Sequence, residues 1–301
     1  MNPLVFHLVS GDAYFSGLLF VLLSLWISPY KKCRKLSLPS LLLGLIFVCL
    51  TAVPVSYLEE TLLVAVFLLT VIVVRQSIVA ANRFQASGKG KPSQQMFRLL
   101  LISKFLISLL VCILILNELS WRASPKFEPK VSRRLIIFAD SITAGKGENE
   151  AETWPNLLMK RHDVQIVDHS RMGATVGSQL KWIHTRIIPE GLIFIELGGN
   201  DMFGATSIKD FRSDLDQLLE LLTQNSQPVV MFELPIPPTF NRFGIAQREL
   251  ASKHGVQLIS KRVFSQVLAT EDATLDSIHL SQAGHNEMAN SVWSEIQTAF
   301  E

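Results

Sequence analysis

Residues 135–143 read Leu-Ile-Ile-Phe-Ala-Asp-Ser-Ile-Thr, and this stretch decides how the second half of the chain folds. The five apolar residues at 135–139 are typical of a buried strand, and the polar residues directly after them predict that the strand ends there. Ser141 then falls at a strand-to-helix junction, where backbone N–H groups favour developing negative charge. Ser141 is therefore a candidate nucleophile. From this stretch alone, a serine that only caps a helix is the simpler interpretation.

Four further short runs rich in Val, Ile and Leu are predicted to be strands, at residues 164–167, 192–197, 229–234 and 256–259. Amphipathic helices separate them. The clearest helix covers residues 208–222, where apolar side chains recur at helical spacing: Ile208, Phe211, Leu215, Leu218, Leu219 and Leu222. Buried strands that alternate with helices are typical of parallel βαβ units. We therefore expect an α/β domain at residues 133–301, with helices on both faces of a parallel sheet.

Polar residues and glycines follow the predicted strands, where the active sites of open α/β sheets gather. Gly173 lies a few residues past the second strand, and Asn200 follows the third. Asp276 and His279 come just before the last predicted helix. Because the carboxyl ends of parallel strands share one edge of a sheet, we expect these residues to meet Ser141 at that edge.

These residue types together provide the parts of a serine esterase. A serine needs a base to take its proton, which His279 can supply, and Asp276 can orient the imidazole. The tetrahedral intermediate needs hydrogen-bond donors, which we assign to the side-chain amide of Asn200 and the backbone N–H groups of Ser141 and Gly173. Taken singly, Asp-x-x-His is most often a surface turn, and Gly-Gly-Asn-Asp is a tight turn after a strand. Their order and complementary chemistry favour one active site.

The same motifs resemble those of the SGNH hydrolase superfamily, also called GDSL esterases and lipases, over nearly all of residues 133–301. The resemblance implies a flavodoxin-like three-layer fold in which four sequence blocks supply Ser, Gly, Asn and His. The matching stretches are Asp140-Ser141 with Thr143, residues 168–175, Gly198-Gly199-Asn200-Asp201 and Asp276-Ser277-Ile278-His279. Trp154-Pro155 and residues 233–238 are similar to bacterial lysophospholipase/arylesterase-like members.

The chain departs from the family pattern in two places. Ala139 stands where the family usually has the Gly of Gly-Asp-Ser, which changes the turn before the nucleophile. Asp168 and Ser170 replace the usual Asn and Gly of the second block, in which Gly173 is the expected oxyanion-hole glycine. Neither departure removes a reacting group, so we expect an active enzyme.

The first 121 residues are more apolar than the rest of the chain. Hydrophobic residues make up 49% of the whole sequence and its mean hydropathy is +0.31, which is high for a single soluble domain. We expect an all-α transmembrane region at residues 1–121, a Pro-containing linker at 122–132 and the hydrolase domain after it. Four runs of membrane-spanning length predict its helices, at about residues 13–29, 38–55, 61–81 and 99–116. Lys104, the charged residue inside the fourth run, is expected to snorkel to a nearby interface.

Charged residues in the short loops predict the orientation of these helices. Basic residues cluster after the first run and before the fourth, whereas the charged residues between the second and third runs are Glu59 and Glu60. By the positive-inside rule, both termini and the hydrolase domain lie outside the inner membrane. Basic residues after the fourth run, Arg122 among them, point the other way, but they lead into a long folded domain where the rule weakens. We expect a retained anchor rather than a cleaved signal peptide, because no basic residue precedes the first run.

The expected protein is thus a membrane-anchored hydrolase of acyl or acetyl esters on lipids or envelope glycans, facing the periplasm. Two alternatives stay open: a polysaccharide O-acyltransferase or deacetylase that uses the same triad, and a membrane scaffold whose hydrolase domain only binds. The bilayer and an ester substrate are the expected partners, and the sequence makes no prediction about protein partners. The net charge of +2 offers no footprint for nucleic acid. The histidines lack metal-ligand spacing, and no cofactor or metal is expected.

Overall fold

The computed structural model describes residues 2–87, 94–127, 132–146, 152–235, 237–276 and 278–301. The basic residues Lys89, Lys91 and Lys130, the motif residue Ser277 and residues 128–131 of the expected linker lie outside these ranges. The chain divides into two compact units, residues 1–10 with 121–301 and residues 11–120.

The larger unit, residues 1–10 with 121–301, is built on a parallel sheet of five strands. The strands are β1 (Arg134–Ala139), β2 (Gln165–Asp168), β3 (Leu192–Glu196), β4 (Val229–Phe232) and β5 (Gln257–Ile259). Their order in the sheet is β2-β1-β3-β4-β5, and all neighbours are parallel. The strands predicted from the sequence are confirmed at nearly the expected positions. The direction of chain winding reverses at β1, which is where ligands bind in sheets of this kind.

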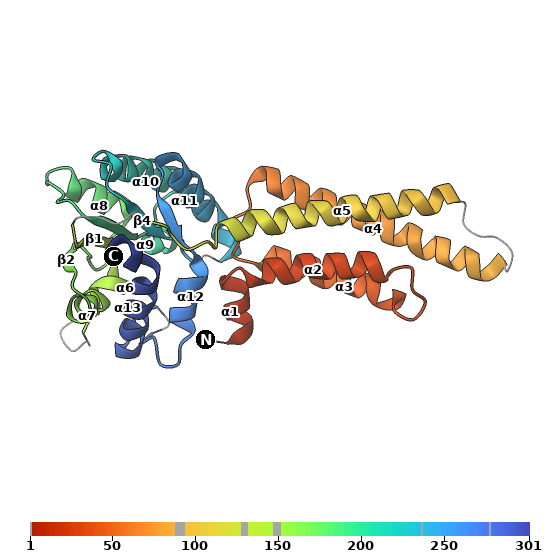
Figure 1. Ribbon diagram of the computed structural model, residues 1–301, viewed down its shortest axis with the longest axis horizontal. Coiled ribbons are helices and arrows are strands. Elements are labelled where there is room, and N and C mark those ends of the chain that lie inside the picture. Colours follow the sequence, from red (N-terminus) through yellow and green to blue (C-terminus); the bar gives the residue numbers. More distant parts are fainter. Residues whose placement is uncertain (1, 88–93, 128–131, 147–151, 236, 277) are drawn as a thin grey trace. The chain divides into compact units, whose positions relative to one another are not determined.

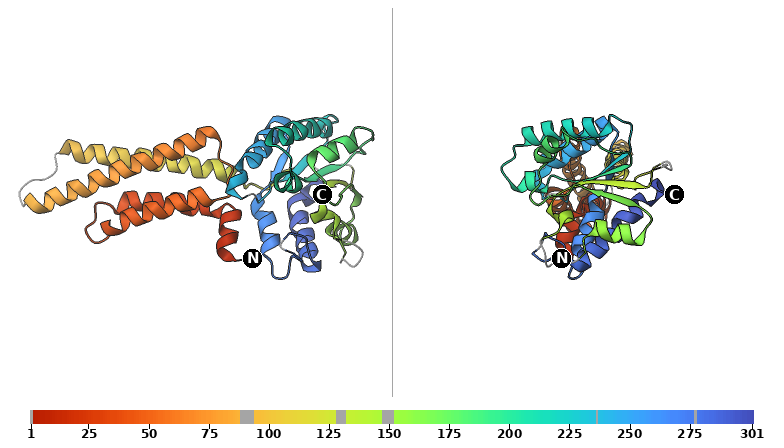
Figure 2. Two further views of the ribbon diagram at one scale, coloured as in Figure 1. Left: turned by 180° about the vertical axis from the view of Figure 1, so that it is seen from behind. Right: turned by 90° about the vertical axis from the view of Figure 1, so that its left-hand side faces the viewer.

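Helices cover both faces of this sheet (Figures 1 and 2). On one face lie α8 (Val176–Ile183), α10 (Ile208–Thr223) and α11 (Asn241–His254). On the other lie α7 (Trp154–Arg161), α12 (Lys261–Ala269) and α13 (Gln282–Ile296). The shorter elements are α6 (Ser141–Ala144), α9 (Gly199–Phe203) and the 3-10 turns η2 (Pro238–Phe240) and η3 (Gln297–Ala299). The predicted α/β fold with a parallel sheet is confirmed.

The core lies on both sides of the central strands. All side chains of β3 are buried. The ring centroid of Phe194 lies 5.2 Å from that of Trp154 and 5.3 Å from that of Phe232. Because helices cover both faces, the strands are continuously apolar rather than alternating. The buried residues of α10 are Phe211, Leu215, Leu218, Leu219 and Leu222, which are five of the six residues in the stripe that its spacing predicted. The sixth, Ile208, is half-buried against the core.

Two segments outside the sheet and its helices also belong to this unit. Helix α1 (Pro3–Val9) contacts α12, where the guanidinium of Arg262 lies 5.8 Å from the ring of Phe6. The expected linker is tied to the edge strand β5. Lys126 N donates to Gln257 Oε1 at 2.7 Å, and Gln257 Nε2 donates to Lys126 O at 2.8 Å. This part of the linker is therefore held against the sheet.

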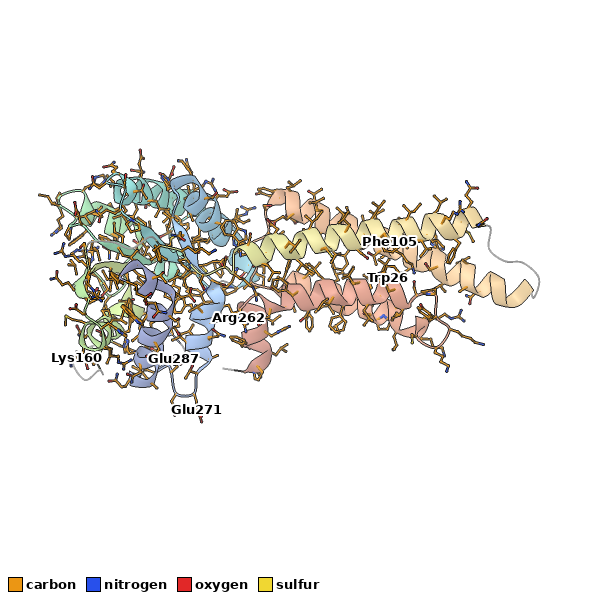
Figure 3. All side chains as sticks on the ribbon, viewed as in Figure 1. Trp26, Phe105, Lys160, Arg262, Glu271 and Glu287 are labelled. Atoms are coloured by element: carbon orange, nitrogen blue, oxygen red, sulfur yellow. The ribbon has the colours of Figure 1, made fainter. Side chains whose placement is uncertain are left out.

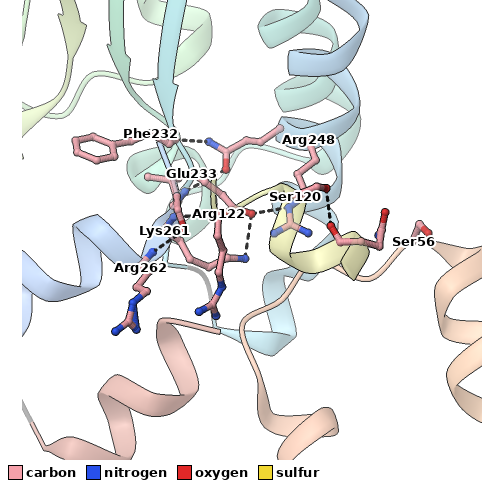
Figure 4. Close-up of polar contacts among 12 residues, drawn as sticks. Ser56, Ser120, Arg122, Phe232, Glu233, Arg248, Lys261 and Arg262 are labelled. Atoms are coloured by element: carbon pink, nitrogen blue, oxygen red, sulfur yellow. Dashed lines mark hydrogen bonds and ion pairs between the residues drawn. The ribbon is translucent and has the colours of Figure 1, made fainter. Parts of the chain in front are cut away.

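A buried ion cluster lies just past β4 (Figure 4). Glu233 Oε1 accepts from Arg248 Nε at 2.6 Å and lies 3.0 Å from Lys261 Nζ. Burial by itself raises the pKa of Glu233, but the charges of Lys261 and Arg248 outweigh burial and lower it to about 2. Arg248 also lies 5.0 Å from the ring of Trp121. The cluster joins α11 and α12 to the end of β4, so Glu233 has a structural role although it follows a strand at the active-site edge.

Residues 11–120 form a unit in which the described regular elements are all helical. They are α2 (Asp12–Ile27), η1 (Arg34–Leu36), α3 (Ser37–Leu50), α4 (Tyr57–Ser87) and α5 (Gln94–Ser120). Leu18, Val21, Val66 and Val111 meet in its core and are fully buried. Many other apolar side chains point outward; examples are Leu42, Leu68, Phe105 and Leu116, each more than half exposed. So much exposed apolar surface is typical of helices that face lipid.

The expectation of four membrane-spanning helices is not confirmed. Within the described residues, two helical stretches are long and apolar enough to cross a membrane, Tyr57–Asn82 and Gln94–Ser120. A third exists only if α1 and α2, which are bent by 88°, form one broken span. Helix α3 has 14 residues, or about 21 Å of length, against a hydrocarbon core of about 30 Å. The run at 38–55 was predicted too long because residues 51–56, which include Pro54, leave the helix.

The expected position of Lys104 is also wrong. Instead of reaching outward, its side chain points into the helical unit, and the residue is only 4% exposed. Its ammonium group donates to Ser28 Oγ at 3.3 Å and lies 5.7 Å from the ring of Trp26.

Candidate active site

Ser141 lies at the carboxyl end of β1, on a turn that the sheet itself positions. The register pairs Ala139 of β1 with Glu196 of β3, so the segments that follow these two strands leave the sheet side by side. Ser141 is the first residue of α6 and is 8% exposed. Asp140 caps this helix, because its Oδ1 accepts from the backbone N–H of Ile142 at 2.9 Å.

The loop that carries Asp276 and His279 is closed by backbone contacts. Thr274 and Leu280 form an antiparallel bridge, and Leu275 N donates to His279 O at 2.8 Å. These contacts hold the loop beside α6, although about 130 residues of chain separate Ser141 from it.

Ser141, His279 and Asp276 form a continuous chain of polar contacts. His279 Nε2 lies 3.2 Å from Ser141 Oγ, and His279 Nδ1 lies 2.9 Å from Asp276 Oδ2. Asp276 Oδ1 also accepts the backbone N–H of His279 at 3.0 Å, which fixes the carboxylate against its own loop. If Nδ1 carries the proton that the carboxylate accepts, Nε2 is free to accept the proton of the serine hydroxyl.

The charge of Asp276 is secured by its neighbours. The Lys146 ammonium lies 2.5 Å from Asp276 Oδ2, and the backbone N–H groups of His279 and Ile278 donate to Oδ1. These contacts hold the pKa of Asp276 well below its usual range. The carboxylate is therefore ionised over the whole pH range in which a serine esterase is active, and it can stabilise an imidazolium on His279.

Asn200 is the second residue of α9, the short helix that follows β3. Its Nδ2 donates to Asp140 Oδ2 and to Ala174 O, both at 3.1 Å. The amide therefore joins three loops of the site, and a donation from it to a ligand would replace the bond to Asp140 or the bond to Ala174. The neighbouring Asp201 accepts the backbone N–H of Val176 at 2.9 Å, so its carboxylate braces the start of α8.

Glycines permit the conformations of the two remaining loops. Gly198 has φ +115°, and a Cβ there would lie 3.0 Å from Leu234 and 3.2 Å from Phe211. Gly173 has φ +68°; both angles fall in the region that side chains disfavour. Within the described part of the chain, the backbone N–H groups of Gly173 and Ser141 have no acceptor. Both are thus free to donate to a ligand.

Glu196, at the end of β3, is a site residue that sequence reasoning missed. It is 1% exposed, and its Oε2 accepts from Thr143 Oγ1 at 3.1 Å. Burial, followed by the negative charge of Asp140, raises the pKa of Glu196 well above its usual range. Burial also raises the pKa of Asp140, to about 6, although the Ile142 N–H opposes it. We assign the shared proton to Glu196, since it is the more completely buried of the two.

A proton on Glu196 also accounts for the hydrogen bonding of its second carboxyl oxygen, Oε1. Glu196 Oε1 is buried and accepts no hydrogen bond from the residues that the structure describes. A proton on Oε1 would be donated to Asp140, and Asp140 would remain an acceptor for Ile142 and Asn200. The signal in the sequence was a glutamate at the end of an otherwise apolar strand, because a buried carboxyl needs a partner.

Replacing Glu196 with glutamine is expected to preserve the fold and to change its dependence on pH. In the parent, the folded state keeps a proton that the unfolded state has lost, so the free energy of unfolding falls as pH rises above the usual glutamate pKa. Glutamine can still donate to Asp140 but does not titrate. The variant should therefore gain stability relative to the parent between about pH 5 and pH 8.

Denaturant unfolding of the full-length protein in detergent, followed by tryptophan fluorescence, measures this difference. Glu220→Gln, on an exposed position of α10, is the matched control and should show no such trend. Glu196→Ala should lose about 1–3 kcal/mol at every pH, because it leaves buried polar groups unpaired. A pH-independent difference between Glu196→Gln and the parent would contradict a protonated Glu196.

Comparisons with known proteins support an esterase. Residues 140–286 match the model of the GDSL-like Lipase/Acylhydrolase family. The chain is 29% identical over 121 residues to an arylesterase of Vibrio mimicus, which covers 38% of this chain and 60% of the arylesterase. It is 23% identical over 190 residues to esterase TesA of Pseudomonas aeruginosa, which covers 55% of this chain and 89% of TesA.

A solved structure shows the same fold. It is the psychrotrophic esterase EstA from Pseudoalteromonas sp., inhibited by monoethylphosphonate. The similarity has a TM-score of 0.51 at 19% identity and covers 55% of this chain and 97% of that one. The family match and the two esterase relatives support an SGNH/GDSL hydrolase domain in the larger unit. It is the domain of a serine hydrolase that acts on ester bonds, as the sequence motifs predicted.

Proposed function

We propose that the protein is a membrane-anchored hydrolase of acyl or acetyl esters carried by lipids or envelope glycans. In this proposal Ser141 is the nucleophile, His279 the general base and Asp276 its orienting carboxylate. Asn200 and the backbone N–H groups of Ser141 and Gly173 form the oxyanion hole. The observation that carries the proposal is the contact of 3.2 Å between Ser141 Oγ and His279 Nε2, in line with the ionised Asp276.

The reaction follows from this arrangement in two halves. Ser141 Oγ attacks the ester carbonyl carbon while His279 Nε2 takes the hydroxyl proton, and the carbonyl oxygen becomes an oxyanion beside Asn200. When the tetrahedral intermediate collapses, the C–O bond of the ester breaks and His279 returns the proton to the leaving alcohol. A water molecule then attacks the acyl-serine, with His279 again as base, and releases the carboxylic acid and free Ser141.

Esters of graded acyl length test this function. The full-length protein is expected to hydrolyse p-nitrophenyl esters, with a maximum of kcat/KM at one chain length that distinguishes an acetyl esterase from a long-chain lipase. Ser141→Ala, prepared and assayed in parallel, should be inactive on every ester. If the parent, shown to be folded by circular dichroism, hydrolyses none of them, a binding scaffold becomes the better interpretation.

The membrane part of the proposal rests on α4 and α5. Both are long and apolar enough to span a bilayer, and the segment between them contains Lys89 and Lys91. By the positive-inside rule that segment is cytoplasmic, so α5 leads outward into the hydrolase domain. This placement of the domain needs only these two spans, whereas the side on which the N-terminus lies depends on whether α1 and α2 form a third.

Fusions to alkaline phosphatase, which is active only after export, check the orientation. A fusion after Glu301 is expected to be active, and a fusion after Lys89 inactive. The reverse pattern would place the hydrolase domain in the cytoplasm and remove envelope glycans from the candidate substrates. Equal activity of both fusions would mean that the chain has no fixed orientation across the membrane.

A further inference from the structure

A pocket in the helical unit lies next to the buried ammonium group of Lys104. It has a volume of about 440 Å³ and is lined by the end of α2, the C-terminal third of α4 and the first turns of α5. Its polar lining includes Tyr30, Ser77 and Lys104, and its apolar lining includes Trp26, Phe97 and Leu101. The volume falls within the range of about 300–1,000 Å³ that is typical of small-molecule sites.

The pocket contains polar groups that the protein itself leaves incompletely paired. Lys104 has three N–H donors, and its one hydrogen-bond acceptor among the described residues is Ser28 Oγ. Ser28 in turn donates to Leu25 O at 2.9 Å. Ser77 lines the pocket, is 4% exposed, and its Oγ is buried without a hydrogen-bond partner in the described part of the chain. Buried donors of this kind point to a ligand that accepts hydrogen bonds.

No carboxylate of the unit can neutralise Lys104. The acidic residues within 11–120 are Asp12, Glu59, Glu60 and Glu118, and all stand near the opposite ends of their helices. Glu118 follows Lys104 by 14 positions on α5, which places it about 21 Å along the helix. A buried cation without a counter-ion costs several kcal/mol. An anion from outside the chain would supply the missing charge.

The surroundings of the pocket favour an anion that is attached to an apolar tail. Trp26 Nε1 donates to Ser108 Oγ at 3.1 Å, and the centre of its ring lies 5.5 Å from that of Phe105 (Figure 3). These contacts hold the indole next to Lys104, whose Nζ lies 5.7 Å from the ring centre. Phe97 and Tyr30 on the rim are more than half exposed. An aromatic and aliphatic rim around a buried cation suits a phosphate headgroup whose acyl chains lie along the outside of the helices.

We propose that this pocket binds the headgroup of an anionic phospholipid, with the Lys104 ammonium as counter-ion to the lipid phosphate and the Ser77 hydroxyl as a second donor. The site is independent of the ester hydrolysis proposed above, but it rests on the proposal that α4 and α5 lie in a membrane. The four basic residues that follow α2 would raise the local concentration of anionic lipid: Lys31, Lys32, Arg34 and Lys35.

Trp26 supplies a direct probe, because it is the tryptophan of residues 11–120 and the other four lie at 121–301. The full-length protein is placed in phosphatidylcholine nanodiscs that contain a small fraction of phosphatidylglycerol with brominated acyl chains. The brominated lipid quenches part of the fluorescence of each protein. The quenching in the parent minus the quenching in Trp26→Phe is the quenching of Trp26 itself. Brominated phosphatidylglycerol should quench Trp26 more than the same mole fraction of brominated phosphatidylcholine does.

Variants distinguish lipid binding in the pocket from attraction of the lipid by surface charge. Lys104→Met is expected to weaken the preference for phosphatidylglycerol about fivefold to tenfold, whereas Lys104→Arg retains it. Lys32→Met, which removes an exposed charge at the same end of the unit, should change it far less. Ser77→Leu keeps the charge but fills the pocket, so it should also reduce the preference, and it serves if Lys104→Met does not fold.

The outcomes are distinguishable. Equal quenching by the two lipids, or an equal loss in Lys104→Met and Lys32→Met, overturns the proposal. Displacement of the lipid by millimolar glycerol phosphate would show a site for a soluble anion instead. If alkaline carbonate extracts the protein from membranes, the anchor itself fails. If ester hydrolysis fails while the lipid preference persists, only the proposed function is affected.

Discussion

Labelling of Ser141 by a fluorophosphonate probe is expected to disappear in His279→Ala, although the serine is still present. Such probes react with serines that a base activates, and His279 Nε2 is the base in contact with Ser141 Oγ. The same change should lower kcat for ester hydrolysis about 10⁴–10⁶-fold, as loss of one member does in other serine triads. Gel fluorescence of labelled protein and p-nitrophenyl ester kinetics measure the two effects.

Two further variants make this result specific. Asp276→Ala should reduce labelling less than His279→Ala does, because orientation and imidazolium stabilisation are lost while the base remains. Ala139→Gly restores the residue that the family usually has before Asp-Ser, and it should label about as well as the parent. Labelling at another serine, or equal labelling with and without His279, would remove the assignment of Ser141.

Asn200→Ala is expected to lower kcat about 10²–10³-fold with little change in KM, since an oxyanion-hole donor acts mainly in the transition state. The structure adds a second consequence. The Asn200 amide joins the Asp140 turn to the Ala174 loop, so its loss should also reduce the free energy of unfolding by about 1 kcal/mol for each hydrogen bond. Steady-state kinetics and denaturant unfolding of the same preparation measure both.

The neighbouring Asp201 offers a matched control. Asp201→Asn changes an adjacent side chain of equal size, and its amide oxygen can still accept the Val176 N–H. It should therefore retain kcat within about tenfold of the parent, a loss well below that of an oxyanion-hole donor. If Asn200→Ala instead raises KM and leaves kcat unchanged, Asn200 binds the substrate in its ground state. A large stability loss without any kinetic effect would make it a purely structural brace.

The sequence predicted the elements of the hydrolase domain well, because their signals are local. The apolar runs at β1 and β3 are continuous, and the Phe211-to-Leu222 stripe of α10 repeats at the helical period. Positions after strands could be assigned to one edge of the sheet because parallel strands all end there. These rules were sufficient to predict that Ser141 and His279 lie close together.

The helical region was predicted less well. Hydropathy reports how apolar a run is and not where its helix stops, so the run at 38–55 was taken as a span although α3 ends at Leu50. Helix α1 was not predicted at all, since its seven residues are too few for a periodic pattern. Its contact with α12 involves residues that are more than 250 positions apart.

The sequence by itself determined the class of chemistry, because the identities and order of the Ser, Asn, Asp and His residues are properties of the chain. Only the tertiary structure decided what surrounds them. Glu196 can share a proton with Asp140 because β1 and β3 are neighbours, and Lys104 lacks a carboxylate partner because its helices place every acidic residue at their other end. Both facts depend on burial and on contacts between residues that are distant in the sequence. Burial and such contacts set the free-energy cost of a buried charge, but they leave no periodic signal in the sequence.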